Sequence, residues 1–343
     1  MERHPIPQDL KQVAAIVTGT LGDAVLSLAP LQAIRAYHPD ATITLFTDPA
    51  LVRVFRHCPF VDAIEAHWRP AGVMEGVKAR WGLWTWGLKA VYDLSATAQT
   101  NALFERFAPF RPLWSGTARG ASHPHVDRGR ARLHRLDRHA EQLCLCGIGP
   151  EDGYPAGAAP LPDLGWIGAD PQEAERIQPA RQGLTGRYAI LAPEGPTDEP
   201  QKCWPVERYA ALATRLRQDG IKPVIVGSPV STGMGEQIRA REPDALDLTA
   251  RLDVFQFVGL ARQALLAVGG EGDLTVVAAA AGAPTVAILN PAATNLRQAA
   301  PRGPATVALV SRSFAEIDIE QVLRAARAVE HRPEPDGAAP AAA

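Results

Sequence analysis

The sequence predicts an α/β protein built from two Rossmann-like domains. In each half of the chain, short apolar segments rich in β-branched residues alternate with segments that carry apolar residues at helical spacing. This alternation is typical of parallel sheets covered by helices. The length of 343 residues suits two domains of about 150 residues each. Residues 147–182 are rich in Pro, Gly and Ala and show little periodicity, as expected of an interdomain connection.

The first half alternates between the two patterns from its beginning. Strands are expected at residues 13–17, 42–47, 61–64 and 90–95, and helices at 23–37, 51–55, 99–107 and 133–144. Pro30 interrupts the apolar stripe of the first helix and is expected to kink it, because proline lacks an N–H and clashes with the preceding turn. Residues 71–89 contain three tryptophans and show no clear pattern.

The second half repeats the alternation more regularly. Strands are expected at residues 188–192, 223–226, 265–268, 285–289 and 306–310, and helices at 206–218, 234–241, 254–263, 274–281 and 314–329. Asp253 is the expected N-cap of the helix at 254–263.

Domain boundaries follow from these patterns. We expect an N-terminal domain at residues 1–165, a linker at 166–186, a C-terminal domain at 187–330 and a disordered Pro/Ala-rich tail at 331–343. Ligands of open α/β sheets bind at the carboxyl ends of the strands, so the predicted site is a cleft between the two sheet edges.

Composition excludes several functional classes. The formal net charge of −2 argues against a nucleic-acid partner. The four cysteines match no zinc spacing and are interpreted as free thiols of a reducing compartment. The N-terminus lacks the pattern of a signal peptide, and no stretch reaches about 18 apolar residues. A cytoplasmic protein is therefore expected.

The turn after the first strand is the first candidate site. Gly19 and Gly22 permit a tight turn and close approach to a ligand, with Thr20 between them. Asp23 follows, where a side chain would project from the carboxyl edge of the sheet. Asp23 has two interpretations at this point, a helix N-cap or a functional carboxylate.

Several common motifs are absent. The turn lacks the third glycine of the G-x-G-x-x-G dinucleotide fingerprint, and no Walker A Lys-Ser/Thr occurs. No Gly-x-Ser-x-Gly nucleophile motif occurs either. The chain therefore does not match an NAD-dependent enzyme, a P-loop NTPase or a serine hydrolase.

The second half contains a glycine-rich turn before a helix, which is typical of diphosphate binding. The turn contains Gly269, Gly270, Glu271, Gly272 and Asp273. Glu271 could accept hydrogen bonds from ribose hydroxyls. The structural alternative is a tight turn in which Asp273 only caps the helix.

The loop after the strand at 188–192 contains Lys202, which could neutralise a phosphate or could be an ordinary solvated lysine. Gly195 and Thr197 in this loop, and Gly227 after the next strand, are further donor-binding candidates. Arginines between Arg128 and Arg138 form either a solvated helix face or a contact for an anionic acceptor or membrane surface.

Three stretches in the same order resemble glycosyltransferase family 9, the heptosyltransferases of bacterial lipopolysaccharide core synthesis. They are Leu21-Gly22-Asp23 continuing through residues 28–35, Lys202-x-Trp204-Pro205 continuing through 207–212, and residues 268–287. The likeness covers most of residues 13–325. It implies the GT-B fold, with two Rossmann-like domains facing each other across a cleft. The N-terminal domain would bind the acceptor, and the C-terminal domain the nucleotide-sugar donor.

The resemblance also implies roles for individual residues. Asp23 takes the place of the family's general base, and Lys202 that of its phosphate-binding lysine. Gly269 to Asp273 takes the place of the loop that holds the sugar nucleotide. The family's Asp-Thr/Ser-Gly-x-x-His segment is Glu271-Gly272-Asp273-Leu274-Thr275-Val276 here, which lacks the hydroxyl and the histidine.

The expected activity is inverting transfer of a heptose or related sugar from a nucleotide-diphosphate sugar to a hydroxyl of a cell-envelope glycan or glycolipid. No cofactor or metal is expected, and peripheral contact with the inner membrane is left open. Two alternatives remain, a sugar-nucleotide epimerase of GT-B fold and a nucleotide-sugar-binding protein that has lost catalysis.

Overall fold

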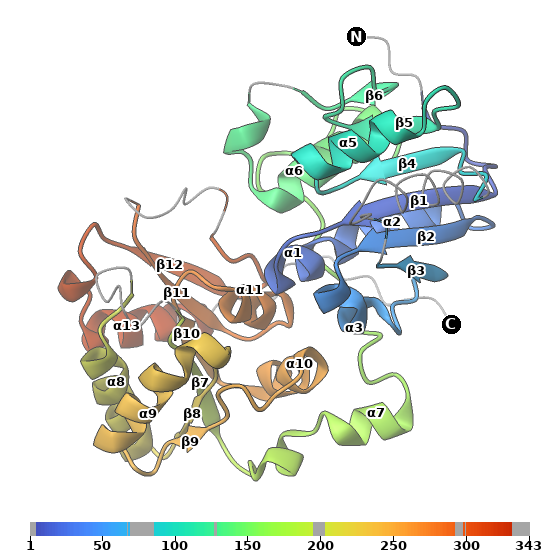
Figure 1. Cartoon of the computed structure of the whole chain (residues 1–343). Helices are drawn as coiled ribbons and strands as arrows, with labels where there is room; N and C mark the ends of the chain where they lie inside the picture. The colour runs from blue at the N-terminus through green and yellow to red at the C-terminus, as the bar shows by residue number, and fades with distance from the viewer. Residues whose placement is uncertain are drawn as a thin grey trace. The chain divides into compact units, whose positions relative to one another are not determined.

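Each half of the chain forms one parallel sheet of six strands in the computed structural model (Figure 1). The structure describes residues 5–66, 68, 86–126, 129–194, 203–291, 298 and 300–330. The chain divides into two compact units, Met1–Trp166 and Ile167–Ala343. Each unit is described by itself below.

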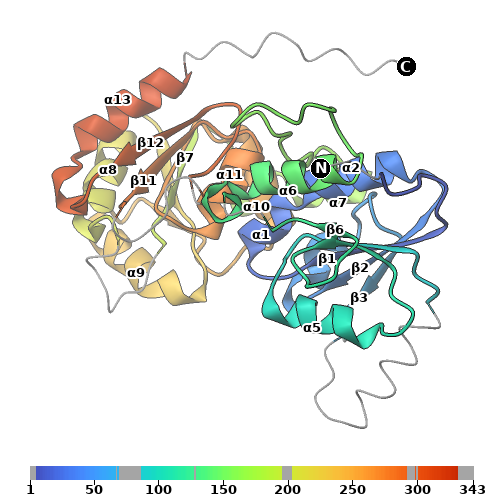
Figure 2. The same ribbon diagram turned by 90° about the horizontal axis from the view of Figure 1, so that it is seen from above.

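The N-terminal unit is built on a sheet with the strand order β3-β2-β1-β4-β5-β6. Its strands are β1 (Gln12–Val17), β2 (Thr42–Thr47), β3 (Ala63–Glu65), β4 (Ala90–Asp93), β5 (Leu113–Gly116) and β6 (His123–Pro124). Its helices are α1 (Leu21–Leu26), α2 (Leu28–Tyr37), η1 (Pro49–Leu51), α3 (Val52–Phe55), α5 (Ala98–Arg106), η2 (Arg130–Arg132) and α6 (Arg135–Leu145). Helices α2 and α6 lie on one face of the sheet and α5 on the other (Figure 2).

The C-terminal unit is built on a sheet with the strand order β12-β11-β10-β7-β8-β9. Its strands are β7 (Tyr188–Ala192), β8 (Lys222–Ile225), β9 (Leu246–Asp247), β10 (Leu266–Gly269), β11 (Thr285–Leu289) and β12 (Thr306–Val310). Its helices are α7 (Pro171–Arg176), η3 (Pro179–Gln182), α8 (Val206–Gln218), η5 (Pro229–Ser231), α9 (Thr232–Arg241), α10 (Val254–Gln263), α11 (Asp273–Ala280), η6 (Phe314–Glu316) and α13 (Ile319–Glu330). Figure 1 shows α8 and α13 on one face of the sheet and α10 and α11 on the other.

The central strands are apolar because both faces of each sheet are covered. Every residue of β7 and β11 is buried, whereas the edge strand β12 is buried nowhere along its length. Trp204 anchors α8 to this core, since its indole N–H donates to the carbonyl of Ile317 at 2.8 Å and its ring packs edge-on against Tyr209. The Trp204-Pro205 pair therefore has a structural role at the start of α8.

Pro30 divides the first helix in two. The expected kink is a full break at Ser27, between α1 and α2. Proline at this position cannot donate to the carbonyl one turn earlier, and its ring clashes with that turn. Separately, the carbonyl of Asp23 accepts from both the hydroxyl of Ser27 at 2.7 Å and its backbone N–H at 3.0 Å. The short helix α1 is separated from the rest of the predicted helix.

Most predicted elements are present within a residue or two of their expected limits. The prediction missed the short strands β5, β6 and β9, and the segment predicted as one helix at 314–329 is η6 followed by α13. Asp253 is the N-cap of α10, as predicted, with Gln256 completing a capping box. Most of the tryptophan-rich segment 71–89 and the tail 331–343 lie outside the described residues.

The segment expected to be a linker carries helix α7 within the C-terminal unit. Arg176 at its end makes ion pairs with Glu173 and with Asp253, each at 2.6 Å. A Cβ at Gly259 of α10 would overlap the backbone carbonyl of Ile177. The segment after α7 therefore lies directly on α10. The domain boundaries themselves stay a prediction.

Replacing Gly259 with alanine tests this backbone contact. We expect a loss of about 1–3 kcal/mol in the free energy of unfolding, because overpacking forces the backbone to move. Alanine is the better helix former by about 1 kcal/mol, so propensity alone predicts the opposite sign. Chemical denaturation measures the difference. Gly186→Ala is the matched control, since a Cβ there meets nothing within 4 Å; unchanged or increased stability in Gly259→Ala would contradict the contact.

Candidate functional site

The turn after β1 positions Asp23 at the carboxyl edge of the N-terminal sheet. Thr20 is the N-cap of α1, and its hydroxyl accepts a hydrogen bond from the Asp23 N–H at 3.3 Å. The carboxylate of Asp23 in turn accepts from the Thr20 N–H at 3.1 Å, which completes a capping box. Gly22 is buried at the second position of the helix. The interpretation of Asp23 as the N-cap is wrong, because Thr20 holds that position.

The position of the Asp23 carboxylate leaves no room for a side chain at residue 19, so this residue must be glycine. Its φ of +118° lies in the region that favours glycine, and a Cβ there would overlap the Asp23 carboxylate. The Gly19 N–H donates to the carboxylate of Asp48 at 3.1 Å. The turn is also linked to the end of β4, where the Ser95 hydroxyl accepts from the Thr18 N–H at 2.7 Å.

Arg135, the first residue of α6, makes an ion pair with Asp23. Its guanidinium lies 2.8 Å from Oδ1, whereas Thr20 binds Oδ2. The side chains are 20% exposed for Asp23 and 30% exposed for Arg135, so water still reaches both. Two contacts from different elements therefore hold the carboxylate in one orientation.

Other arginines near α6 are partly buried. Burial lowers the pKa of Arg138 to about 10, and the positive charges of Arg130 and Arg135 lower it further, while Asp23 acts in the opposite direction. Arg132 is exposed, and Arg128 lies outside the described residues. The alternative of a wholly solvated helix face is therefore wrong for Arg130, Arg135 and Arg138. Such a concentration of partly desolvated positive charge favours an anionic partner.

Asp93, at the end of β4, is a buried carboxyl that the prediction missed. Its side chain is fully buried, and Oδ1 accepts from the Ala96 N–H at 2.8 Å. Burial raises the pKa of Asp93 to about 6, although the hydrogen bonds and the nearby Arg130 charge lower it. The sequence could have indicated Asp93, because it is an acidic residue near the carboxyl end of a predicted strand. Asp93 stabilises the turn after β4, which lies beside β1 at the same sheet edge as Asp23.

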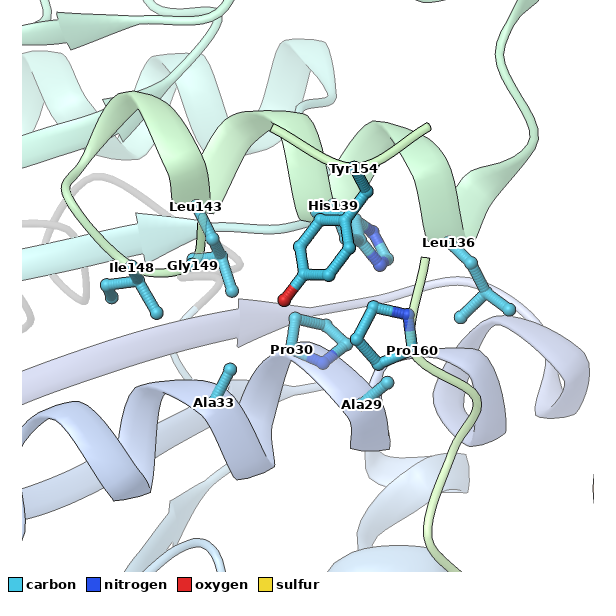
Figure 3. A pocket seen from close by; sticks show the side chains of 11 residues that line it. Ala29, Pro30, Ala33, Leu136, His139, Leu143, Ile148, Gly149, Tyr154 and Pro160 are labelled. Atoms are coloured by element: carbon cyan, nitrogen blue, oxygen red, sulfur yellow. The ribbon is translucent and has the colours of Figure 1, made fainter. Parts of the chain in front are cut away.

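A small apolar pocket lies between α2 and α6 (Figure 3). It has a volume of about 60 Å³, enough for a few waters or a small apolar group. His139 is its buried polar residue, with Nε2 at 3.1 Å from the carbonyl of Leu94. Burial lowers the pKa of His139 to about 3, and the neighbouring arginines add to this. The imidazole is therefore neutral and packs α6 onto the end of β4.

The glycine-rich turn of the C-terminal unit lies between β10 and α11. Gly272 is the N-cap of α11 and offers no side chain to its free N–H groups. The carboxylate of Glu194, just after β7, accepts from the Leu274 N–H at 3.3 Å. Glu271 is exposed, and partial desolvation of its carboxyl raises its pKa. The prediction placed the turn correctly between a strand and a helix, and the structure shows that the Glu194 carboxylate contacts the first turn of that helix.

Packing explains two of the predicted donor-binding glycines. A Cβ at Gly269 would overlap the hydroxyl of Thr275, and one at Gly227 would lie 2.9 Å from the Cβ of Ser231. Both positions require a small residue for close packing, whether or not a ligand binds. Gly270 lies alongside Glu194, and Asp273 opens α11.

Three predicted residues, Gly195, Thr197 and Lys202, lie outside the described residues. The structure therefore brings Gly19, Thr20, Gly22 and Asp23 together at one sheet edge, and places residues 269–273 at the edge of the other sheet. The roles of all these residues stay predictions. The binding of a donor by Gly227 also stays a prediction.

The described residues hold neither a cluster of metal ligands nor a membrane-spanning helix. Among those residues, no group of three or more His, Cys, Asp or Glu side chains could hold a metal ion. Within the same part of the chain, the helices are all too short or too polar to cross a bilayer. The absence of a metal requirement stays a prediction.

Comparison with known proteins points to one family. Residues 162–319 match the model of glycosyltransferase family 9 (heptosyltransferase). Lipooligosaccharide heptosyltransferase 2 of Haemophilus influenzae is 24% identical over 288 residues, which cover 79% of this chain and 81% of that protein.

Solved structures show the same fold. The E. coli ADP-heptose lipopolysaccharide heptosyltransferase II has a TM-score of 0.75 at 19% identity, covering 93% of this chain and 98% of that chain. The E. coli heptosyltransferase WaaC, solved with ADP, has a TM-score of 0.69 at 18% identity and covers 92% and 99%. The GT-B fold class is confirmed. The resemblance to glycosyltransferase family 9 is confirmed by sequence, through the family model over residues 162–319 and the Haemophilus influenzae relative.

Proposed function

We propose that the chain is an inverting glycosyltransferase. It would transfer a heptose or related sugar from a nucleotide-diphosphate sugar to a hydroxyl of a cell-envelope glycan or glycolipid, as in lipopolysaccharide core synthesis. The observation that carries the proposal is the Asp23 carboxylate, held at the sheet edge by Thr20 and Arg135. The family resemblance supports it, and the similar E. coli structures bear the names of heptosyltransferases.

Asp23 would act as the general base. A hydroxyl is a weak nucleophile near neutral pH, so proton removal by a positioned carboxylate contributes on the order of 10²–10⁴-fold. The acceptor oxygen would then form a bond to the anomeric carbon as the bond to the diphosphate breaks, which inverts that carbon. Arg135 would keep the carboxylate ionised and oriented before the proton arrives.

The C-terminal unit would bind the donor. The N–H groups at the start of α11, of which those of Leu274 and Thr275 contact the Glu194 carboxyl, suit a diphosphate because the helix dipole places partial positive charge there. Lys202 would add a full positive charge to the leaving diphosphate, as the family resemblance implies. We propose that transfer needs no metal ion. Glu271 would contact the ribose or the sugar.

The acceptor would be anionic. Arg130, Arg135 and Arg138 concentrate positive charge in the same unit as Asp23. Because their burial costs free energy without a counterion, an acceptor phosphate or carboxylate would relieve that cost. A glycolipid acceptor would bring the protein to the inner membrane surface as a peripheral partner, with the protein otherwise cytoplasmic.

A second candidate is a nucleotide-sugar-binding protein that has lost transfer activity. The observation in its favour is the Glu194 carboxylate, which contacts the first turn of α11 and would repel a diphosphate bound there. An epimerase is the remaining alternative from the fold. Incubation with a nucleotide sugar and no acceptor separates the epimerase from the other two classes, since only an epimerase forms an epimer. Adding the acceptor then separates a transferase, which forms the glycosylated product, from a binder, which does not.

Asp23→Asn tests the general base. We expect transfer to fall by about 10²–10⁴-fold with little change in nucleotide-sugar affinity, because asparagine keeps the shape but accepts no proton. Product formation measures the first effect and calorimetric titration of the donor measures the second. Asp48→Asn is the control for loss of another carboxylate that contacts the same turn. Full activity in Asp23→Asn would remove Asp23 as the base.

Arg135→Ala tests the orientation of Asp23. We expect kcat to fall by roughly 10- to 100-fold, because a base misplaced by about 1 Å loses much of its effect. Arg132→Ala, at an exposed position nearby, is the charge-matched control and should stay within about twofold if a general change of charge matters little. Equal losses in the two variants would indicate a general electrostatic effect instead.

Thermal-shift screening with ADP-, GDP-, UDP- and dTDP-linked sugars tests donor binding. A ligand at 100 times its Kd stabilises the native state by about 2.7 kcal/mol, which raises the melting temperature measurably. We expect one nucleotide to give a shift and the others little. No shift with any of the four would contradict the proposed function.

A further inference from the structure

Glu194 occupies the position in which a bound anion would meet α11. It follows β7, and its backbone N–H donates to the carbonyl of Ala192 at 2.9 Å. Its Oε1 accepts from the Leu274 N–H at 3.3 Å, and the Thr275 N–H also contributes to this carboxyl. A residue from a neighbouring strand thus supplies the anion that caps this helix.

The second carboxylate oxygen of Glu194 has no such partner. Oε2 is a buried atom without a hydrogen bond among the described residues. It lies so close to Gly272 that a Cβ there would overlap the carboxylate. Gly272 caps α11 without a side chain, so its lack of a Cβ makes room for Glu194. The two features form one arrangement, a glycine N-cap and an acid placed over it.

The groups around Glu194 favour its neutral form. Burial raises the pKa of this carboxyl to about 7, and the negative charge of Asp273 on α11 raises it further, although hydrogen bonds from Leu274 and Thr275 lower it. Tyr209 on α8 is buried close enough for the Glu194 charge to help raise its pKa. Lys202 lies outside the described residues. The carboxyl is therefore poised to change its charge near neutral pH.

We propose that Glu194 controls diphosphate binding at α11, admitting the donor only when its carboxyl is neutral or turned away from the helix. The inference rests on the proposed function, in which α11 holds the donor. A diphosphate and an ionised carboxylate cannot share the same few N–H groups, because like charges in a buried site repel strongly. Glu194 thereby sets the affinity for the donor.

The proposal has a definite pH dependence. If only the neutral form binds, the apparent Kd rises by the inverse of the neutral fraction. With a carboxyl pKa of about 7, that factor is about 1.1 at pH 6 and about 11 at pH 8. Affinity therefore falls as the pH rises through 7.

Calorimetric titration of the full chain with ADP and with inorganic diphosphate, at pH 6 and pH 8, tests the proposal. Glu194→Gln keeps the shape and the acceptor for Leu274 but cannot ionise. We expect this variant to bind ADP about tenfold more tightly than the unchanged protein at pH 8 and about equally at pH 6. Comparison between the two proteins at each pH cancels the titration of the ligand's own phosphate. Glu236→Gln, at an exposed position of α9, is the control for net charge.

The outcomes separate the two hypotheses. Equal ADP affinities for the unchanged protein and Glu194→Gln at pH 8 would overturn the role of Glu194 and leave the proposed function standing. No binding of ADP or diphosphate by either protein at either pH would overturn both. Thermal unfolding checks that Glu194→Gln is folded, and Glu194→Ala provides a second variant in which repulsion is also absent. Weaker ADP binding in both variants would show that Glu194 assists the donor, contrary to the proposal.

Discussion

Both candidate sites depend on one constraint: the first N–H groups of a helix have no acceptor within the helix. At both sites this helix begins where a strand ends, at the edge of the sheet. Each such helix needs an acceptor for these groups. In the N-terminal unit the need is met within the turn, by Thr20 and Asp23. In the C-terminal unit the N-cap Gly272 has no side chain to accept these hydrogen bonds, and Glu194, just after β7, accepts from the Leu274 N–H. The same physical requirement thus places one carboxylate at each sheet edge, with different consequences.

The two carboxylates differ because their surroundings differ. Asp23 is partly exposed and lies beside Arg135, so its negative charge is stabilised. Glu194 is enclosed near Asp273, so burial and repulsion favour the neutral acid. A partly solvated, oriented carboxylate suits the role of a base toward an incoming hydroxyl. An enclosed acid over a helix N-terminus suits the selection of what binds there. Environment, more than residue type, separates the two proposed roles.

The surroundings of the arginines in the N-terminal unit also determine their electrostatic properties. Arg130 and Arg138 are held close to one another and to Arg135, and burial lowers the pKa values of both. Buried like charges are stable only where packing elsewhere compensates or where an anion binds. Asp23 provides one negative charge, and Asp93 partly balances Arg130. In the proposed function, this arrangement would place an anionic acceptor and the base in one unit.

The sequence by itself determined the two alternating halves, most strand and helix limits, the N-cap Asp253 and the position of Asp23 at a sheet edge. These features depend on local periodicity and turn chemistry, which a single segment carries. Only the tertiary structure decided that Arg135 pairs with Asp23 and that Glu194 contacts the first turn of α11. Arg135 lies 112 residues after Asp23 and Glu194 lies 80 before Leu274, and no local pattern marks such pairs. Strand order brings them together, because parallel strands distant in sequence end at a common edge.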